Sequence, residues 1–157
     1  MIMDAIDVIK GSLAECWVVI GDNRYNFAQA ISLEASIEKN KSTVPVLGKT
    51  GKHNIASGWE GTGSMTLHYN SPVIRDMLYT YKKTGVDTYF EIEVTNEAPN
   101  SNVGNQRVIL KGCTVDGGIL TKFDADADYL EEDVDFTFDD FEIPEKFVVP
   151  KKFVTKA

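Results

Sequence analysis

The sequence predicts a mainly β protein: a β-sandwich or partial β-barrel of about eight strands with one flanking α-helix. Three observations carry this prediction. Apolar and polar residues alternate with period two through most of the chain, and clusters of Gly, Asn and Asp separate the alternating runs. A single segment has the 3.6-residue spacing of an amphipathic helix. At 157 residues, the chain is predicted to form one domain, residues 1–157, around one core.

The N-terminal third is predicted to supply a hairpin and a long amphipathic strand. Two apolar runs flank residues 21–24, whose Gly-Asp-Asn sequence is typical of a hairpin turn. Residues 31–38 then alternate between apolar and polar side chains, which predicts a strand with one face in the core and one in water or a polar cavity. Pro45 lacks the N–H that a central strand needs, so a continuation through Val44 and Val46 should be an edge or a break.

The next segment, residues 48–63, holds five glycines and few core residues. We therefore expect a mobile loop here, forming an exposed arm, because long loops in compact domains are uncommon unless they serve a function. A strand follows, with Met65, Leu67 and Tyr69 on one face.

The predicted helix follows this strand and carries clear signals at both ends. Ser71 is a suitable N-cap, Pro72 suits the first helical position, and Gly85 can end the helix after Lys82 and Lys83, whose charges favour a helix C-terminus. The side chains predicted to pack on the sheet share one stripe: Val73, Ile74, Met77, Leu78 and Tyr81.

The C-terminal half is predicted to be β structure. Alternating or apolar runs predict strands over residues 90–95, 107–115, 119–125 and 130–143, with a turn at 126–129. The doubled Asp139-Asp140 shifts the phase of the last strand, as a β-bulge does.

Charge and cysteine usage limit the classes of function. The formal charge of −8 argues against binding to a phosphate backbone, which depends on Lys and Arg. Eleven acids lie between Lys122 and Glu145, whereas residues 148–157 form a basic C-terminal tail.

Cys16 and Cys113 lie in apolar runs without metal-ligand spacing, so we expect buried thiols. The chain has neither a signal-peptide pattern nor an apolar run of about 20 residues, so we expect no membrane span and synthesis in a cytoplasm.

The run Asp124-x-Asp126-x-Asp128 looks like the start of a calcium loop. A full loop would need glycine at its sixth position and glutamate at its twelfth, where this chain has Tyr129 and Asp135. A monomeric β-sandwich binding module with a weak divalent-cation site in this acidic turn remains the alternative hypothesis.

No enzyme motif is present in the sequence. The chain lacks a G-x-S-x-G nucleophile motif and a phosphate loop, and neither His53 nor His68 has a motif-linked partner. We therefore expect no catalysis, no cofactor and no dedicated metal site. The acidic strand faces can be solvated surface, or they can line an aqueous channel that several subunits share. These faces carry Glu34 and Glu38, Glu91 and Glu93, and Asp133 and Asp135.

Three strings together point to a known family. "SLEASIEKNKSTVPVLGKTGKH", "GWEGTGSMTLHYNSPVIRDMLYTYKKTGVDTYFEIEVTNE" and "LEEDVDFTFDDFEIPEKF" resemble the inner tail-tube proteins of contractile phage tails, in the branch shared with defective prophages and R-type phage-tail-like bacteriocins. The likeness covers roughly residues 30–147.

The resemblance implies homohexameric rings that stack into a tube inside a contractile sheath, with strands pooled into a ring barrel on assembly. Further implied partners are baseplate and terminator proteins, and DNA or a tape-measure protein that passes through the lumen without tight binding. Assembly would take place in the bacterial cytoplasm before release of a phage tail or bacteriocin particle. We expect an acidic or neutral lumen, with Glu34, Glu38, Asp133 and Asp135 as candidate lining residues. Residues 48–63 would be an inter-subunit arm, with candidate contacts Val44, Val46, Leu47, Ile55 and Trp59.

Overall fold

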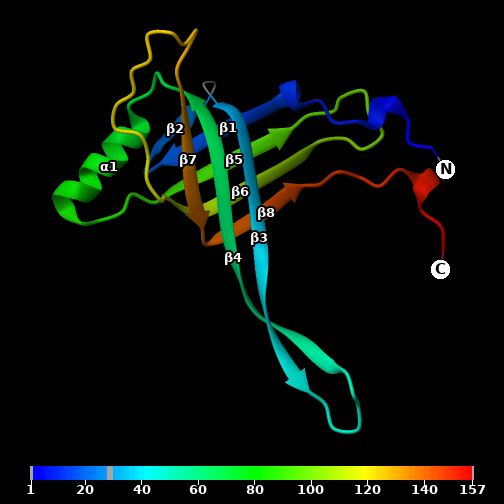
Figure 1. The fold of residues 1–157 in the computed structure, drawn as a ribbon. Coiled ribbons are helices and arrows are strands. Elements are labelled where there is room, and N and C mark those ends of the chain that lie inside the picture. Colours follow the sequence, from blue (N-terminus) through cyan, green and yellow to red (C-terminus); the bar gives the residue numbers. More distant parts are fainter. Residues whose placement is uncertain (1, 28–29, 157) are drawn as a thin grey trace.

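A computed structural model describes residues 2–27 and 30–156 and contains, within these ranges, eight strands and one α-helix (Figure 1). Three short 3₁₀ helices, η1 (Ala5–Asp7), η2 (Gly11–Leu13) and η3 (Lys151–Phe153), lie near the chain ends. The strands and the helix are β1 (Ala14–Ile20), β2 (Asn23–Asn26), β3 (Ala30–Pro45), β4 (Lys52–His68), α1 (Val73–Thr84), β5 (Phe90–Asn96), β6 (Gln106–Val115), β7 (Glu131–Phe138) and β8 (Asp140–Glu145).

The strands form one antiparallel sheet that folds over on itself. Its order is β2-β1-β5-β6-β7-β4-β3, and β8 pairs with β6. Most of β6 pairs with β5 and β8, but its last residues, Thr114 and Val115, pair with β7. Strands β3, β4 and β7 therefore run across the direction of β1, β5, β6 and β8, with α1 at one side (Figure 1). This arrangement confirms the predicted fold class; the single chain does not close into a barrel.

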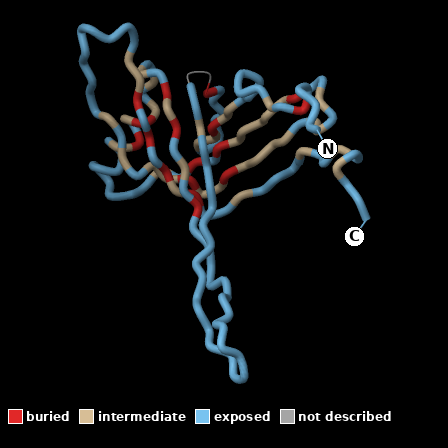
Figure 2. Tube along the Cα trace, turned by 45° about the vertical axis from the view of Figure 1, so that its right-hand side comes forward, coloured by how far each residue is buried: buried red, intermediate tan, exposed pale blue. Residues whose placement is uncertain are grey.

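The core lies between the two crossing parts of the sheet and beneath α1 (Figure 2). Each fully buried apolar side chain stabilises the fold by about 1.5–3 kcal/mol. Strands β1, β5 and β6 contribute Val18, Ile92, Leu110 and Cys113, strands β4 and β7 contribute Met65, Leu67, Val134, Phe136 and Phe138, and α1 contributes Ile74 and Met77.

Helix α1 begins and ends close to the predicted residues. The Val73 N–H donates to Ser71 Oγ at 3.4 Å, and Pro72 is the N-cap. Gly85 adopts the left-handed conformation, with φ of 71°, and its N–H donates to Tyr81 O at 2.8 Å. The α1 side chains that were predicted to pack on the sheet do so, except for Tyr81. Tyr81 is exposed because the last turn of the helix extends past the sheet.

Two predictions about strands were wrong. Residues 119–125 form no strand; they belong to an irregular loop, since the chain leaves the sheet after β6 and re-enters it at β7. Residues 130–143 form two strands rather than one bulged strand. At Asp139, whose N–H donates to Lys111 O at 3.0 Å, the chain turns a corner from the β4 side of the sheet to the β6 side.

The predicted core face of residues 31–38 is largely exposed. Leu33 packs against the core, but Ile31 and Ile37 are exposed. Strand β3 is the edge of the sheet, so the core does not cover most of its length. The structure agrees with the expectation that Pro45 marks an edge, because Pro45 ends β3.

The prediction of a mobile loop over residues 48–63 was also wrong, because residues 52–63 belong to the 17-residue strand β4. Gly61 and Gly63 lie opposite Phe138 and Phe136 of β7. The two phenyl rings lie on these glycines so closely that a Cβ at either position would overlap the ring. The glycines therefore make room for core aromatics and do not mark a flexible loop.

Replacing Gly63 with alanine is expected to lower the free energy of unfolding by about 1–3 kcal/mol, because Phe136 is fully buried and cannot move aside without repacking the core. Denaturant unfolding measures this change. Gly51→Ala is the matched control, since no atom lies within 4 Å of the new Cβ there. Equal stability of the two variants would contradict the assigned packing.

Candidate assembly surfaces

A long β-hairpin extends from the body of the protein (Figures 1 and 2). Strands β3 and β4 remain paired out to Pro45 opposite Lys52, and every residue from 34 to 60 is exposed. We call residues 39–59 the arm. It consists of two hydrogen-bonded strands joined by a turn over residues 46–51, so the β pairing, rather than packing on the body, fixes its direction.

Four of the five predicted arm residues lie at the distal end. Ser42 pairs with Ile55 and Val44 with His53, which puts Val44 and Ile55 on the same face of the hairpin. Val46 and the fully exposed Leu47 lie in or next to the turn.

The fifth predicted arm residue, Trp59, lies elsewhere. Its ring packs against Phe138 and Phe141, with centroids 6.2 and 5.6 Å apart, and so anchors the base of the arm to the body.

All four candidate lumen residues lie on one face of the layer formed by β3, β4 and β7. Glu34, Ser64 and Asp135 form one row across the three strands. In the next row, Thr66 Oγ1 donates to Asp133 Oδ1 at 2.8 Å. Because side chains on one strand alternate between faces, Glu38 lies on the same side as Glu34. The phenyl rings of β7 point to the opposite side, into the core.

Glu60 belongs to the same face, directly opposite Glu38, and is not among the residues predicted from the sequence. Its alternation with Thr62, Ser64 and Thr66 was a usable signal, but the surrounding glycines disguised the strand. Like charges in direct cross-strand pairing are destabilising in an isolated chain.

The acidic face is electrostatically uncompensated. Within residues 2–27 and 30–156, no ion pair involves Glu34, Glu38, Glu60, Asp133 or Asp135. The predicted acidic face of β5 differs, since Glu93 Oε1 lies 3.3 Å from Arg24 Nη2 and 2.6 Å from Arg107 Nε.

A buried ion pair holds α1 against β7. Arg75 Nη1 lies 2.6 Å from Glu132 Oε2, and the Glu132 side chain is only 1% exposed. Arg75 also donates to the carbonyl oxygens of Ile119 and Ser71, and its guanidinium stacks on the Tyr69 ring. These contacts of Arg75 hold together α1, β7 and the loop before β7. In the sequence, Glu132 looked like one more surface acid of the acidic run.

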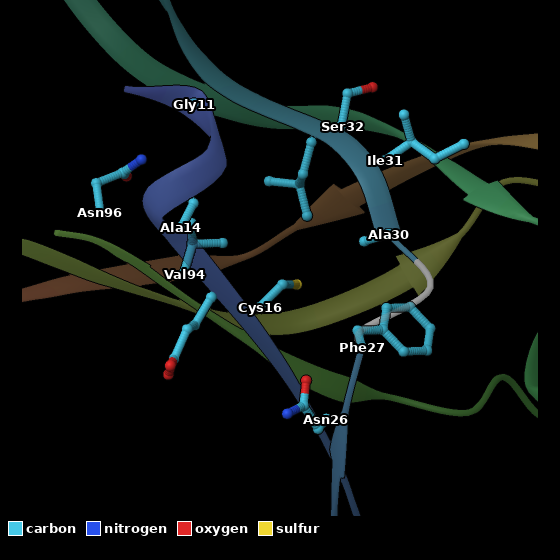
Figure 3. Close-up of a pocket in the computed structure, with 12 residues that line it drawn as sticks. Gly11, Ala14, Cys16, Asn26, Phe27, Ala30, Ile31, Ser32, Val94 and Asn96 are labelled. Atoms are coloured by element: carbon cyan, nitrogen blue, oxygen red, sulfur yellow. The ribbon is translucent and has the colours of Figure 1, made fainter. Parts of the chain in front are cut away.

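The thiol of Cys16 faces a pocket but is not an activated nucleophile. The pocket has a volume of about 510 Å³, and Cys16 extends into it from β1, with Phe27 and Ala30 on the opposite wall (Figure 3). Burial raises the pKa of Cys16 to about 11 and that of Cys113 to about 12, so both thiols are protonated and weakly nucleophilic at neutral pH. Both are free; Cys113 is buried as predicted, whereas Cys16 is partly buried.

The acidic turn has no metal-site geometry. In the described part of the chain, no group of three His, Cys, Asp or Glu side chains is placed to hold an ion. The Asp126 N–H instead donates to Asp124 Oδ1 at 3.1 Å, which is an ordinary Asx turn. Across the same described residues, the structure has no helix with the length and apolarity to cross a membrane.

The protein combines a β-sheet body with a long exposed hairpin, free sheet edges and a one-sided acidic face, features typical of subunits that assemble through their strands. The chain belongs to the phage tail tube protein family, whose model matches residues 1–145. It is 35% identical over 115 residues to the phage-like element PBSX protein XkdM of Bacillus subtilis (strain 168), an alignment that covers 73% of this chain and 78% of XkdM. These matches confirm the predicted resemblance to tail-tube proteins.

Solved structures show the same fold. A chain of the six-fold symmetrised baseplate of the anti-feeding prophage matches with a TM-score of 0.63 at 11% identity, covering 91% of this chain and 97% of that one. A chain of the sheath-tube complex of the extracellular contractile injection system PVC, in its extended state, matches with a TM-score of 0.60 at 10% identity, covering 82% and 86%.

Proposed function

We propose that this tail-tube subunit builds the inner tube of a contractile phage tail or an R-type phage-tail-like bacteriocin. Six copies form a ring, and rings stack into a tube that the sheath surrounds and that baseplate and terminator proteins close. The family membership supports the tube, and the six-fold and sheath-tube assemblies of the matched folds support the hexamer and the sheath. The subunit is made in the bacterial cytoplasm and leaves it in the finished particle.

The acidic face of β3, β4 and β7 is the observation that carries the proposal for the lumen. A conduit for DNA, ions or a tape-measure protein must not bind its cargo tightly, and acidic walls repel phosphate. Six copies of a chain at −8 carry −48 in one ring. Glu34, Glu38, Asp133 and Asp135, together with Glu60, then line the lumen. The mutual repulsion of these groups is tolerated because water and counterions fill the channel.

Negative-stain electron microscopy of the purified protein tests the tube. Rings with six-fold symmetry and stacked tubes are the expected result. The competing hypothesis, a monomeric β-sandwich module with a divalent site in the acidic turn, requires instead a stable monomer that binds calcium at micromolar concentration in calorimetry. If the protein stayed monomeric at all concentrations and bound calcium measurably, the tube proposal would be refuted in favour of this competing hypothesis.

Reversing the charge of the acidic face should turn the tube into a DNA-binding tube. Glu38→Lys with Asp135→Lys is expected to retain labelled DNA in pelleted tubes at least about tenfold better than the wild type, with loss of binding at high salt. Asp22→Lys with Asp87→Lys is the control, since it makes the same charge change in two exposed loops. If the control tubes retained DNA equally well, the lumen assignment would be refuted.

A further inference from the structure

The arm and the loop before β7 lie at opposite ends of the same strands (Figures 1 and 2). Strand β4 runs from the arm to the far end of the body, and β7 returns antiparallel to it from the loop over residues 119–130. We call residues 119–130 the acidic loop. In a stack of identically oriented subunits whose β4 strands run along the stacking axis, the arm of one copy would approach the acidic-loop end of the next.

The arm is basic and apolar. Residues 39–59 contain four lysines and no acidic residue, in a chain whose net charge is −8. Two of these lysines, Lys49 and Lys52, flank the tip beside the exposed Val46 and Leu47. Such a surface binds best where an apolar patch is bordered by carboxylates.

The acidic loop presents that combination. Phe123 is 91% exposed, Leu120 71% and Tyr129 63%, although the Tyr129 ring packs edge-on against His68, so the loop presents a cluster of large exposed apolar side chains. Asp124, Asp126 and Asp128 alternate along the same exposed segment. The loop's one base, Lys122, forms no ion pair with these aspartates; its Nζ donates instead to Glu131 O at 2.8 Å.

The loop is also held in place before any partner arrives. Tyr69 N–H donates to Leu130 O at 3.0 Å, and Arg75 Nη1 donates to Ile119 O at 3.2 Å, so both ends of the loop are fixed to the body. A preorganised loop loses less conformational entropy on binding than a mobile one.

Other exposed apolar patches are less suitable for a basic arm. Tyr79 and Tyr81 of α1 lie beside Lys82 and Lys83. The apolar groove near Ile6 is lined by one base, Lys10, and one acid, Glu97, and Asp4 beside it is already paired, because Lys152 Nζ lies 2.6 Å from Asp4 Oδ2. The acidic face of β3, β4 and β7 carries no exposed apolar side chain that would cover the arm tip.

We infer that the arm of one subunit docks onto the acidic loop of a second copy of this chain, with Leu47 and Phe123 at the apolar centre and lysines facing aspartates around it. This inference rests on the proposed tube function and adds the site, the polarity and the salt sensitivity of the contact. The run of aspartates that resembles a calcium loop thus receives lysines rather than a metal ion.

A charge-swap experiment tests the contact through the rate of tube growth in light scattering and electron microscopy. The arm variant K49E/K52E and the loop variant D124K/D126K are each expected to grow at least about tenfold more slowly than the wild type, because like charges then face each other across the contact. The fourfold variant K49E/K52E/D124K/D126K should recover to within about threefold of the wild-type rate.

Two controls separate this contact from effects of net charge. K146E/K151E makes the same change as the arm variant but in the exposed C-terminal region, and should grow normally. D124K/D126K/K146E/K151E has the wild-type net charge with mismatched partners, and should stay slow. If the mismatched variant grew as well as the swapped one, the inference would be overturned.

Disulfide trapping tests the apolar centre directly. L47C and F123C proteins with different tags are mixed during assembly and oxidised; the native thiols stay protonated at neutral pH. A mixed L47C–F123C dimer is expected, with at least about tenfold less between L47C and the helix control Y79C. Equal trapping in both mixtures would refute the docking site. Failure of the wild type to form tubes would instead overturn the proposed function, and the inference with it.

Discussion

A protein whose arm is cut back should remain a folded monomer that no longer grows tubes. The register suggests a precise cut: Lys41 and Ala56 are cross-strand partners, so residues 42–55 can be replaced by Asn-Gly, which closes a two-residue hairpin. Every removed residue is exposed, and the anchoring contacts of Trp59 are retained. The free energy of unfolding should therefore change by less than about 1 kcal/mol.

Loss of tube growth is expected to be complete, because the cut removes the whole distal part of the arm, whose residues are all exposed and free to contact another subunit. Electron microscopy counts tubes, and circular dichroism with denaturant unfolding checks the fold. A variant of the same length as the wild type, with residues 42–55 replaced by a Gly-Ser linker, separates the loss of the arm's surface from a change in length. Tubes of normal length from either variant would contradict the arm assignment.

The second large effect is expected in the core. Arg75→Ala should lower the free energy of unfolding by about 3–5 kcal/mol, because it leaves the Glu132 carboxylate buried without its partner. For a domain of this size, the melting temperature should fall by roughly 10 °C. The loop before β7 should also loosen, since Arg75 holds the Ile119 carbonyl.

A second substitution identifies the cause of this loss. Adding Glu132→Gln to Arg75→Ala removes the buried charge while keeping the side-chain shape, and should recover part of the lost stability. Lys82→Ala, on the exposed face of the same helix, is the control and should cost less than about 0.5 kcal/mol. A loss below about 1 kcal/mol for Arg75→Ala, or no recovery by Glu132→Gln, would show that the ion pair does not hold α1 against β7.

Local patterns predicted much of the fold. The turn at Gly21, the caps of α1 and the period-two runs of β5, β6 and β7 depend on short-range backbone preferences that can be read from neighbouring residues. The candidate lumen residues were found in the same way, because alternation along one strand determines which side chains share a face. The errors arose where a residue's role depends on a distant partner. Gly61 and Gly63 were interpreted as loop residues because the phenyl rings that require them belong to β7.

The sequence by itself determined the class of fold, the family, and the alternation that gathers acids on one side of each strand. Only the tertiary structure decided which strands bring those acids together, that Glu93 of β5 pairs with two arginines while the acids on the face of β3, β4 and β7 form no ion pair, and that the arm is a paired β-hairpin. It also separated Glu132 from the acidic run by burying it against Arg75. The physical reason is range: propensity and periodicity act over a few residues, whereas burial, ion pairing and register depend on segments that meet only after the chain has folded.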